Sequence, residues 1–258
     1  SLSVATSFSN AGAAVLSGGG VQVFGGSAVN SGTLRFVDTS ASFSGDYKER
    51  GVLTSTGSRL GLVNVTIDPD GAWEAAAGDH FLILGSVSNG SARSDAWKTD
   101  GATLAFEVDP ARFDHEDLED GLVTAPASQF MLAGSDQGAR ERGYLGNYSW
   151  YRLSLGRFVT LQLGDGNATN GAALYVRVLQ LEGGIDQLDS IRSDFNIYYD
   201  ASVAENAYLN SGTFAFEGRG RLVPIAAAVP EPGTWILLAG GGLIIGTHMR
   251  RRREPVVH

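Results

Sequence analysis

Short apolar segments separated by glycine, serine and asparagine make up most of the first hundred residues. Val63, Val65 and Ile67 alternate with polar positions, as in a β-strand with one buried face. A turn is expected directly after them at residues 68–71, because proline presets φ and glycine tolerates positive φ. The pattern predicts short strands at residues 21–24, 33–37, 52–54, 63–67 and 81–84.

Two folds accommodate these strands. Strands with glycine and asparagine corners bury a core when they stack as the coils of a β-solenoid. The segments that resemble the closing coils of parallel solenoids in autotransporter-type surface proteins are residues 30–33, 44–47, 63–66 and 76–81. No strict repeat period is visible, so an antiparallel meander remains the alternative. The Asn-Ser-Gly-Thr sequence of residues 30–33 recurs at 210–213, and both copies predict a turn followed by a strand.

The second region alternates in several places and predicts antiparallel sheets with one solvent-exposed face, as in a β-sandwich. The apolar sets are Leu104, Phe106 and Val108; Val159, Leu161 and Leu163; Leu174, Val176 and Val178; and Phe195, Ile197 and Tyr199. Short helical turns are expected at 185–191 and 203–209, and residues 111–143 are expected to form an acidic, loop-like segment.

These patterns predict an all-β protein with a single C-terminal transmembrane helix. Residues 1–100 are expected to form a short β-solenoid or meander, and residues 101–228 an antiparallel β-sandwich. Residues 229–258 form a separate tail. The chain begins at Ser1 without a methionine or a signal peptide, so we expect that the N-terminal segment was removed or that the sequence is a fragment.

Composition and charge narrow the classes of function. The chain of 258 residues contains 35 glycines and no cysteine, so neither disulfides nor thiolate metal sites contribute. Residues 1–229 carry 15 basic and 26 acidic side chains, a balance of −11 within a total of −9. This acidic balance argues against nucleic acid as a partner, because nucleic-acid binding needs basic surface.

The C-terminal end departs from the strand pattern. The sequence Val-Pro-Glu-Pro at 229–232 precedes an apolar run at 234–249 and then four arginines. A helix of this length, about 24 Å, is short for a hydrocarbon core of roughly 30 Å. It spans if the bilayer thins and Trp235 and the arginines anchor its ends. The six large aliphatic residues contribute about −3 kcal/mol of insertion free energy; they are Ile236, Leu237, Leu238, Leu243, Ile244 and Ile245.

The arginine cluster is expected to remain in the cytoplasm and to leave residues 1–229 outside it; it consists of Arg250, Arg251, Arg252 and Arg253. Pro230 and Pro232 stop helix propagation and hold Glu231 extended at the membrane face. The tripeptide, the short span and the arginines together resemble the PEP-CTERM sorting signal. Residues 195–200, 206–209 and 218–224 also resemble the membrane-proximal ends of PEP-CTERM proteins.

The resemblance implies a Gram-negative bacterium and an exported precursor held transiently at the inner membrane. It also implies processing by an exosortase, a transpeptidase-like membrane enzyme, which would recognise Pro230, Glu231 and Pro232. The processed protein would then reach the cell surface or the extracellular matrix and associate with exopolysaccharide or biofilm.

Motifs of common enzyme chemistry are missing from the sequence, including Gly-x-Ser-x-Gly, the phosphate-binding loop and His-Glu-x-x-His. Outside the tail, His80 is expected in a turn at the start of a core strand, and His115 is expected in a solvated acidic loop. The acidic segments 114–120 and 165–171 are the candidates for calcium, but neither follows the EF-hand order. We therefore expect no catalytic residue, no cofactor and no metal site.

The sequence favours a non-enzymatic surface or matrix protein with a structural or adhesive role. The alternative is a carbohydrate-binding or glycan-cleaving surface protein, for which paired carboxylates about 5 to 10 Å apart in an aromatic-lined cleft would be the sign. The candidate sugar-stacking residues are Trp150, Tyr151, Tyr198 and Tyr199, although such aromatic residues more often belong to the core or to cross-strand pairs.

Overall fold

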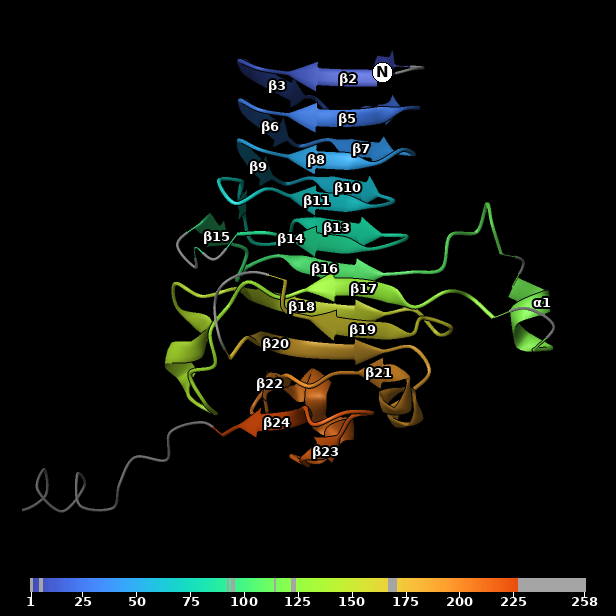
Figure 1. Ribbon diagram of the computed structural model, residues 1–258, viewed down its shortest axis with the longest axis vertical. Helices are drawn as coiled ribbons and strands as arrows, with labels where there is room; N and C mark the ends of the chain where they lie inside the picture. The colour runs from blue at the N-terminus through green and yellow to red at the C-terminus, as the bar shows by residue number, and fades with distance from the viewer. Residues whose placement is uncertain are drawn as a thin grey trace, which may run out of the picture. The chain divides into compact units, whose positions relative to one another are not determined.

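The computed structural model describes residues 2–4, 7–91, 93, 96–113, 115–121, 124–166 and 171–226. In this part of the chain the strands wind into a parallel β-solenoid, with each coil stacked on the preceding one (Figure 1). From β1 to β22, strands that follow one another along the chain belong to different sheets, and each pairs with the equivalent strand of the next coil. At the C-terminal end, β22, β23 and β24 all belong to the first sheet.

Three sheets form the faces of the solenoid. The first contains, in spatial order, β1 (Leu2–Val4), β4 (Val21–Phe24), β7 (Ser40–Phe43), β10 (Arg59–Leu62), β13 (His80–Ile83), β16 (Thr103–Phe106), β18 (Ser149–Leu155), β20 (Ala173–Leu181), β22 (Asn196–Asp200), β24 (Arg221–Ile225) and β23 (Phe214–Ala215). The second contains β2 (Ser7–Asn10), β5 (Ser27–Asn30), β8 (Tyr47–Glu49), β11 (Val65–Ile67), β14 (Val87–Asn89), β17 (Ser128–Met131), β19 (Leu161–Gly164) and β21 (Ile191–Arg192). The third contains β15 (Trp97–Lys98), β12 (Ala72–Ala75), β9 (Val52–Thr56), β6 (Thr33–Val37) and β3 (Ala13–Ser17).

The register of the first sheet reveals a repeat. Val21 pairs with Ser40 and Ser40 with Arg59, so each of these coils takes 19 residues. The next partners are His80 and Thr103, which lengthen the coil to 21 and then 23 residues. Because corners of different lengths absorb these changes, the stacking stays in register while the sequence period drifts.

The core lies inside the coils and consists of side chains in columns. One column on the first sheet contains Leu60, Phe81, Leu104, Leu153 and Leu179, all nearly inaccessible to solvent. Each member packs on the equivalent residue of the next coil, and residues of the other two sheets close the same hydrophobic cluster. Because each coil buries its apolar side chains mainly against its neighbours, stability comes from stacking.

The predicted strands at 21–24 and 33–37 are confirmed as β4 and β6, and the solenoid is confirmed over the meander. The antiparallel sandwich predicted for residues 101–228 is wrong in strand direction, because β16, β18, β20 and β22 pair in parallel. The only antiparallel pair among the described strands is β23 with β24. A solenoid strand has one buried and one solvent-exposed face, so it alternates as an antiparallel strand does.

A long insertion interrupts the solenoid between β16 and β18. Thr103 pairs with Arg152, so this coil takes 49 residues. It contains β17 and the short helix α1 (His115–Glu119), which stands away from the stack (Figure 1). A second part of the insertion, residues 132–148 with the 3-10 helix η2 (Glu141–Tyr144), returns to the solenoid. The predicted acidic loop is therefore partly a strand and a helix.

The C-terminal coils contain short helical elements in place of strands. The turns predicted at 185–191 and 203–209 are confirmed as the 3-10 helices η3 (Ile185–Ser190) and η4 (Ala204–Leu209). Among the described residues, no helix is long and apolar enough to cross a bilayer. The span predicted at 234–249 lies outside the described residues.

Candidate functional site

The strands β18 and β20 are longer than the strands of the earlier coils, and each changes the face that it buries part of the way along. In β18, Trp150 and Leu153 both belong to the core, with Tyr151 and Arg152 between them. The backbone amides of Tyr151 and Arg152 both donate to the carbonyl of Ala102, at 3.0 and 3.3 Å. Two residues of β18 thus lie opposite one residue of the neighbouring chain segment, which defines a β-bulge. After the bulge, the positions of β18 that face the core change from even-numbered to odd-numbered residues.

The same reversal occurs in the neighbouring strand β20, where Val176 and Leu179 are both core residues. Arg177 and Val178 lie between them. Val178 is completely buried, but it is not part of that core cluster and lines a hollow on the outer side of the sheet. The prediction that Leu174, Val176 and Val178 share one core face is therefore wrong at its last member. The bend leaves two surfaces on the outside of the C-terminal coils: a polar network around Arg177 and a hollow next to Val178.

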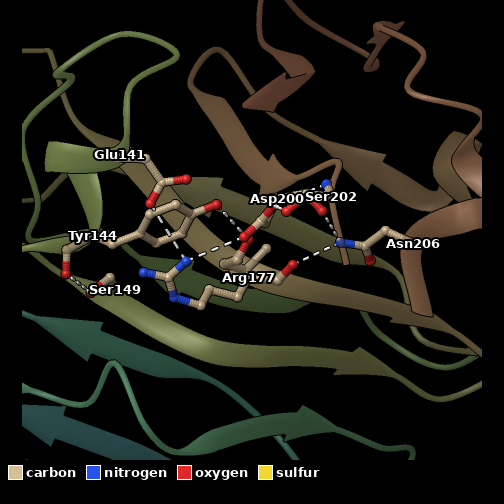
Figure 2. A network of polar contacts seen from close by, with 8 residues as sticks. Glu141, Tyr144, Ser149, Arg177, Asp200, Ser202 and Asn206 are labelled. Carbon is tan, nitrogen blue, oxygen red and sulfur yellow. Dashed lines mark hydrogen bonds and ion pairs between the residues drawn. The ribbon is translucent and has the colours of Figure 1, made fainter. Parts of the chain in front are cut away.

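The polar network fastens the insertion to the last coils (Figure 2). The Arg177 guanidinium lies 3.2 Å from a carboxylate oxygen of Asp200 and 3.6 Å from one of Glu141. It also stacks on the Tyr144 ring, 4.3 Å from the centroid. Asp200 is buried and accepts two further hydrogen bonds, from the amide and the hydroxyl of Ser202, at 2.9 and 2.6 Å. Every charged group of this network therefore has a partner within the protein.

A second contact layer lies beside the network. Tyr175 and Tyr198 stack with ring centroids 4.7 Å apart, and the Tyr198 hydroxyl donates to Asp136 at 2.8 Å. Burial, reinforced by the hydrogen bond to Asp136, raises the pKa of Tyr198 to about 12. Burial also raises the pKa of the Tyr144 phenol. Both phenols are thus neutral at physiological pH and act as structural contacts between the insertion and the sheet.

The C-terminal part of β20, beyond the residues that pair with β22, is bonded by side chains of η4. The Asn206 amide donates to the carbonyl of Arg177 at 2.7 Å and accepts from the amide of Leu179 at 3.0 Å. The Tyr208 hydroxyl donates to the carbonyl of Leu179 at 3.0 Å. These bonds satisfy backbone groups of β20 that β22 leaves unpaired, and so they protect this part of the strand from pairing with a further strand.

The hollow next to Val178 has a volume of about 510 Å³. Its floor is formed by β18 and β20, with Arg152 donating to the Gln180 side chain. Ile185 of η3 and Tyr208 of η4 stand at its sides, 40% and 39% exposed. A second hollow of about 430 Å³ shares Arg152 and Gln180 and continues across β16 and β13. Together they form a groove on the outer face of the first sheet.

The candidate sugar-stacking residues do not form one platform. Trp150, Tyr198 and Tyr199 are buried, so the interpretation as core or cross-strand aromatic residues applies to them. Tyr151 is 36% exposed. The exposed aromatic ring beside the groove, Tyr208, was missed, because neither alternation nor a motif marks a residue in a short 3-10 helix.

The candidates for histidine and calcium chemistry stay unsupported in the described part of the chain. His80 begins β13 as expected and is half-buried, and burial with the nearby Arg59 lowers its pKa. In the residues that the structure describes, no group of three or more histidine or carboxylate side chains is arranged to hold a metal ion. Residues 114 and 167–170 of the candidate calcium segments lie outside the described residues, as do the side chains of residues 115 and 117.

The predicted sorting residues also lie outside the described residues, which end at Ala226, one residue after β24. They are Pro230, Glu231, Pro232, the anchor residues from Trp235 to Ile245 and Arg250 to Arg253. Comparison with known families does cover this part of the chain: the family model of the PEP-CTERM protein-sorting motif matches residues 228–253. No curated protein and no solved structure matches the chain.

The match confirms the resemblance seen in the sequence. The chain carries a PEP-CTERM sorting motif, and it carries it directly after a β-solenoid. The motif supports exosortase-dependent export and sorting, and it implies a membrane-anchored precursor that an exosortase processes.

Proposed function

We propose that this protein is a non-enzymatic component of the bacterial surface or extracellular matrix, with a structural or adhesive role in exopolysaccharide. In this proposal the tail delivers the protein and the β-solenoid performs its function outside the cell. Pro230, Glu231 and Pro232 form the recognition element, the apolar run holds them at the membrane, and the arginines set the orientation.

The sorting motif at residues 228–253 is the observation that carries this proposal. A tail of this kind addresses a protein to the outside of the cell and adds no chemistry of its own. The proposal therefore places the function in the solenoid, which would meet polysaccharide after delivery.

The character of the solenoid supports a structural or adhesive role. Its ionisable groups around Arg177 are engaged in contacts between the insertion and the last coils. Stacked coils present wide, nearly flat faces on a rigid framework, which suits contact with an extended polymer. The acidic balance of residues 1–229 keeps such a protein soluble once it is released.

The test of the sorting step uses the full chain in cells that contain the cognate exosortase. Glu231→Ala is expected to leave the solenoid folded and to block removal of the tail, and Glu254→Ala is the matched control, an acidic residue of the tail outside residues 228–253. Mass spectrometry of the mature C-terminus separates processed from unprocessed protein. Normal processing of Glu231→Ala would refute the role of Glu231.

The test of the destination is separate. Cell fractionation should find the processed protein at the surface or in the matrix, and deletion of its gene should reduce the polysaccharide retained by the cells. Recovery of the processed protein only from the periplasm would contradict the proposed role.

A further inference from the structure

We propose that the groove on the outer face of β13, β16, β18 and β20 binds an uncharged oligosaccharide chain, with Tyr208, Gln180 and Arg152 as the main contacts. This inference rests on the proposed function, because the groove meets polysaccharide only if the protein is exported.

The shape of the groove fits a linear polymer. Two hollows of about 510 and 430 Å³ meet at Arg152 and Gln180. They run across four neighbouring strands of one sheet, a distance of about 14 Å at the usual spacing of paired strands. Both are open to solvent along their length, with β-strands as a rigid floor. A chain of sugar units can lie in such a groove without its ends being enclosed.

The side chains in the groove suit hydroxyl groups and sugar rings. Gln180 is exposed and offers both a donor and an acceptor, and Arg152 offers several donors in one plane. Tyr208 presents part of its ring at the side, while its hydroxyl is held by the carbonyl of Leu179 at 3.0 Å. The ring is therefore fixed in place, and a fixed aromatic surface can pack against the C–H groups of a sugar at little cost in conformational entropy.

Charge decides between classes of polysaccharide. The lining residues include one arginine and three glutamates, Glu107, Glu182 and Glu205, and Arg152 already lies 3.8 Å from Glu205. His80 adds no positive charge near neutral pH, because burial and Arg59 lower its pKa. This surface repels a polyanionic chain, so the ligand is an uncharged oligosaccharide and not one rich in uronic acids.

The structure also argues against a peptide in this place. Peptides commonly bind a β-sheet by adding a strand to its edge. Here the part of β20 that β22 leaves unpaired is already bonded by Asn206 and Tyr208, through the amide and the carbonyl of Leu179. Recognition in the groove therefore depends on side chains that point outward from the sheet, as expected for a saccharide.

The experiment uses the full chain, purified in detergent micelles, on an array of uncharged and acidic oligosaccharides. The strongest uncharged ligand is then titrated by calorimetry. Tyr208→Leu is expected to weaken binding at least tenfold and Gln180→Ala about fivefold. Gln162→Ala is the matched control, an exposed glutamine on a strand of the second sheet that is hydrogen-bonded to Gln129, and it should bind as the wild type does.

Near-UV circular dichroism and thermal unfolding establish whether each variant is folded. If Tyr208→Leu does not fold, Gln180→Ala still tests the inference. Binding of acidic glycans only, binding unaffected by the groove substitutions, or binding of no glycan by the folded protein would each overturn the inference. If the glycan-binding test fails but the protein is processed normally and reaches the surface, the groove inference is wrong and the proposed function stands. Loss of processing or of surface location contradicts the proposed function independently of any glycan.

Discussion

The side-chain amide of Asn206 occupies the place of a peptide group in a neighbouring strand, bonding β20 on both sides of Val178, just beyond the residues that pair with β22. It accepts from the amide of Leu179 at 3.0 Å and donates to the carbonyl of Arg177 at 2.7 Å. The same amide donates to the carbonyl of Asp200 at 2.7 Å. One buried side chain thus ends the hydrogen-bond ladder and ties η4 to the coil that contains Asp200.

Replacing this side chain tests how much the closure contributes to stability. Asn206→Ala leaves the amide of Leu179 and the carbonyls of Arg177 and Asp200 without partners, and we expect a loss of about 3 kcal/mol in the free energy of unfolding. Urea unfolding followed by circular dichroism measures it. The surface substitution Gln162→Ala should stay within about 0.5 kcal/mol of the wild type. A similarly small effect of Asn206→Ala would show that water replaces the hydrogen bonds of the Asn206 side chain.

The sequence predicted the positions of the strands better than their partners. Alternation reports which side chains are buried, and the strands at residues 21–24 and 33–37 follow from it directly. It carries no information about whether the neighbouring strand runs parallel or antiparallel. Both the 19-residue coil and the parallel sheets depend on contacts between residues of different coils, which no local pattern contains.

The repeated Asn-Ser-Gly-Thr sequence shows the same limit. Asn30 ends strand β5 and donates to Glu49 of the next coil at 2.8 Å. Asn210 instead follows η4 in the left-handed conformation, with φ of 52°. The two copies share turn-forming residues, but their neighbours place one in a stacked corner and the other at a helix end.

The functional residues fall into two groups, those that lie together in the sequence and those that the fold brings together. The sorting motif lies in a contiguous segment, so the order and spacing of its parts were enough to show the resemblance to PEP-CTERM signals, and the comparison with known families confirms it. The groove joins Arg152, Gln180 and Tyr208 from three elements, and the bulge that turns Arg152 outward leaves no mark in the sequence. Sites of this second kind become visible once the coils are stacked.

Stacked glycines at one corner of the solenoid provide a test of how closely the coils approach. A Cβ atom at Gly51 would lie 2.0 Å from the carbonyl oxygen of Gly32, which accepts from the amide of Val52 at 2.8 Å. Because the obstacle is backbone, no change of rotamer relieves it. Gly51→Ala is expected to destabilise the protein by about 3 kcal/mol.

Gly12 supplies the matched control, since it occupies the equivalent corner of an earlier coil and a Cβ atom there meets no heavy atom within 4 Å. Gly12→Ala should unfold at nearly the wild-type urea concentration. Equal midpoints for the two variants would mean that the corner can widen without loss of stacking.

The same corner contains a buried carboxyl group. Glu49 is 1% exposed and accepts from the Asn30 amide at 2.8 Å and from the Tyr47 hydroxyl at 2.6 Å. Asn10 continues the line by donating to Asn30 at 2.8 Å. Burial raises the pKa of Glu49 to about 7 in spite of these donors, because removing a carboxylate from water costs more than they return.

This carboxyl group should make stability fall as pH rises. The pKa is about 7 in the folded protein and near 4.5 when the chain is unfolded, so between these values the folded state holds a proton that the unfolded state releases. The free energy of unfolding is therefore highest below about pH 4.5 and falls by about 3 kcal/mol by neutral pH, as far as this group is concerned.

Glu49→Gln should match the wild type near pH 4.5 and exceed its stability at pH 7.5. Tyr47→Phe should act in the opposite direction at pH 7.5, since the ionised carboxylate loses a donor. Urea unfolding of the three proteins at both pH values measures the difference, and a gap between Glu49→Gln and wild type that does not change with pH would disprove the coupling.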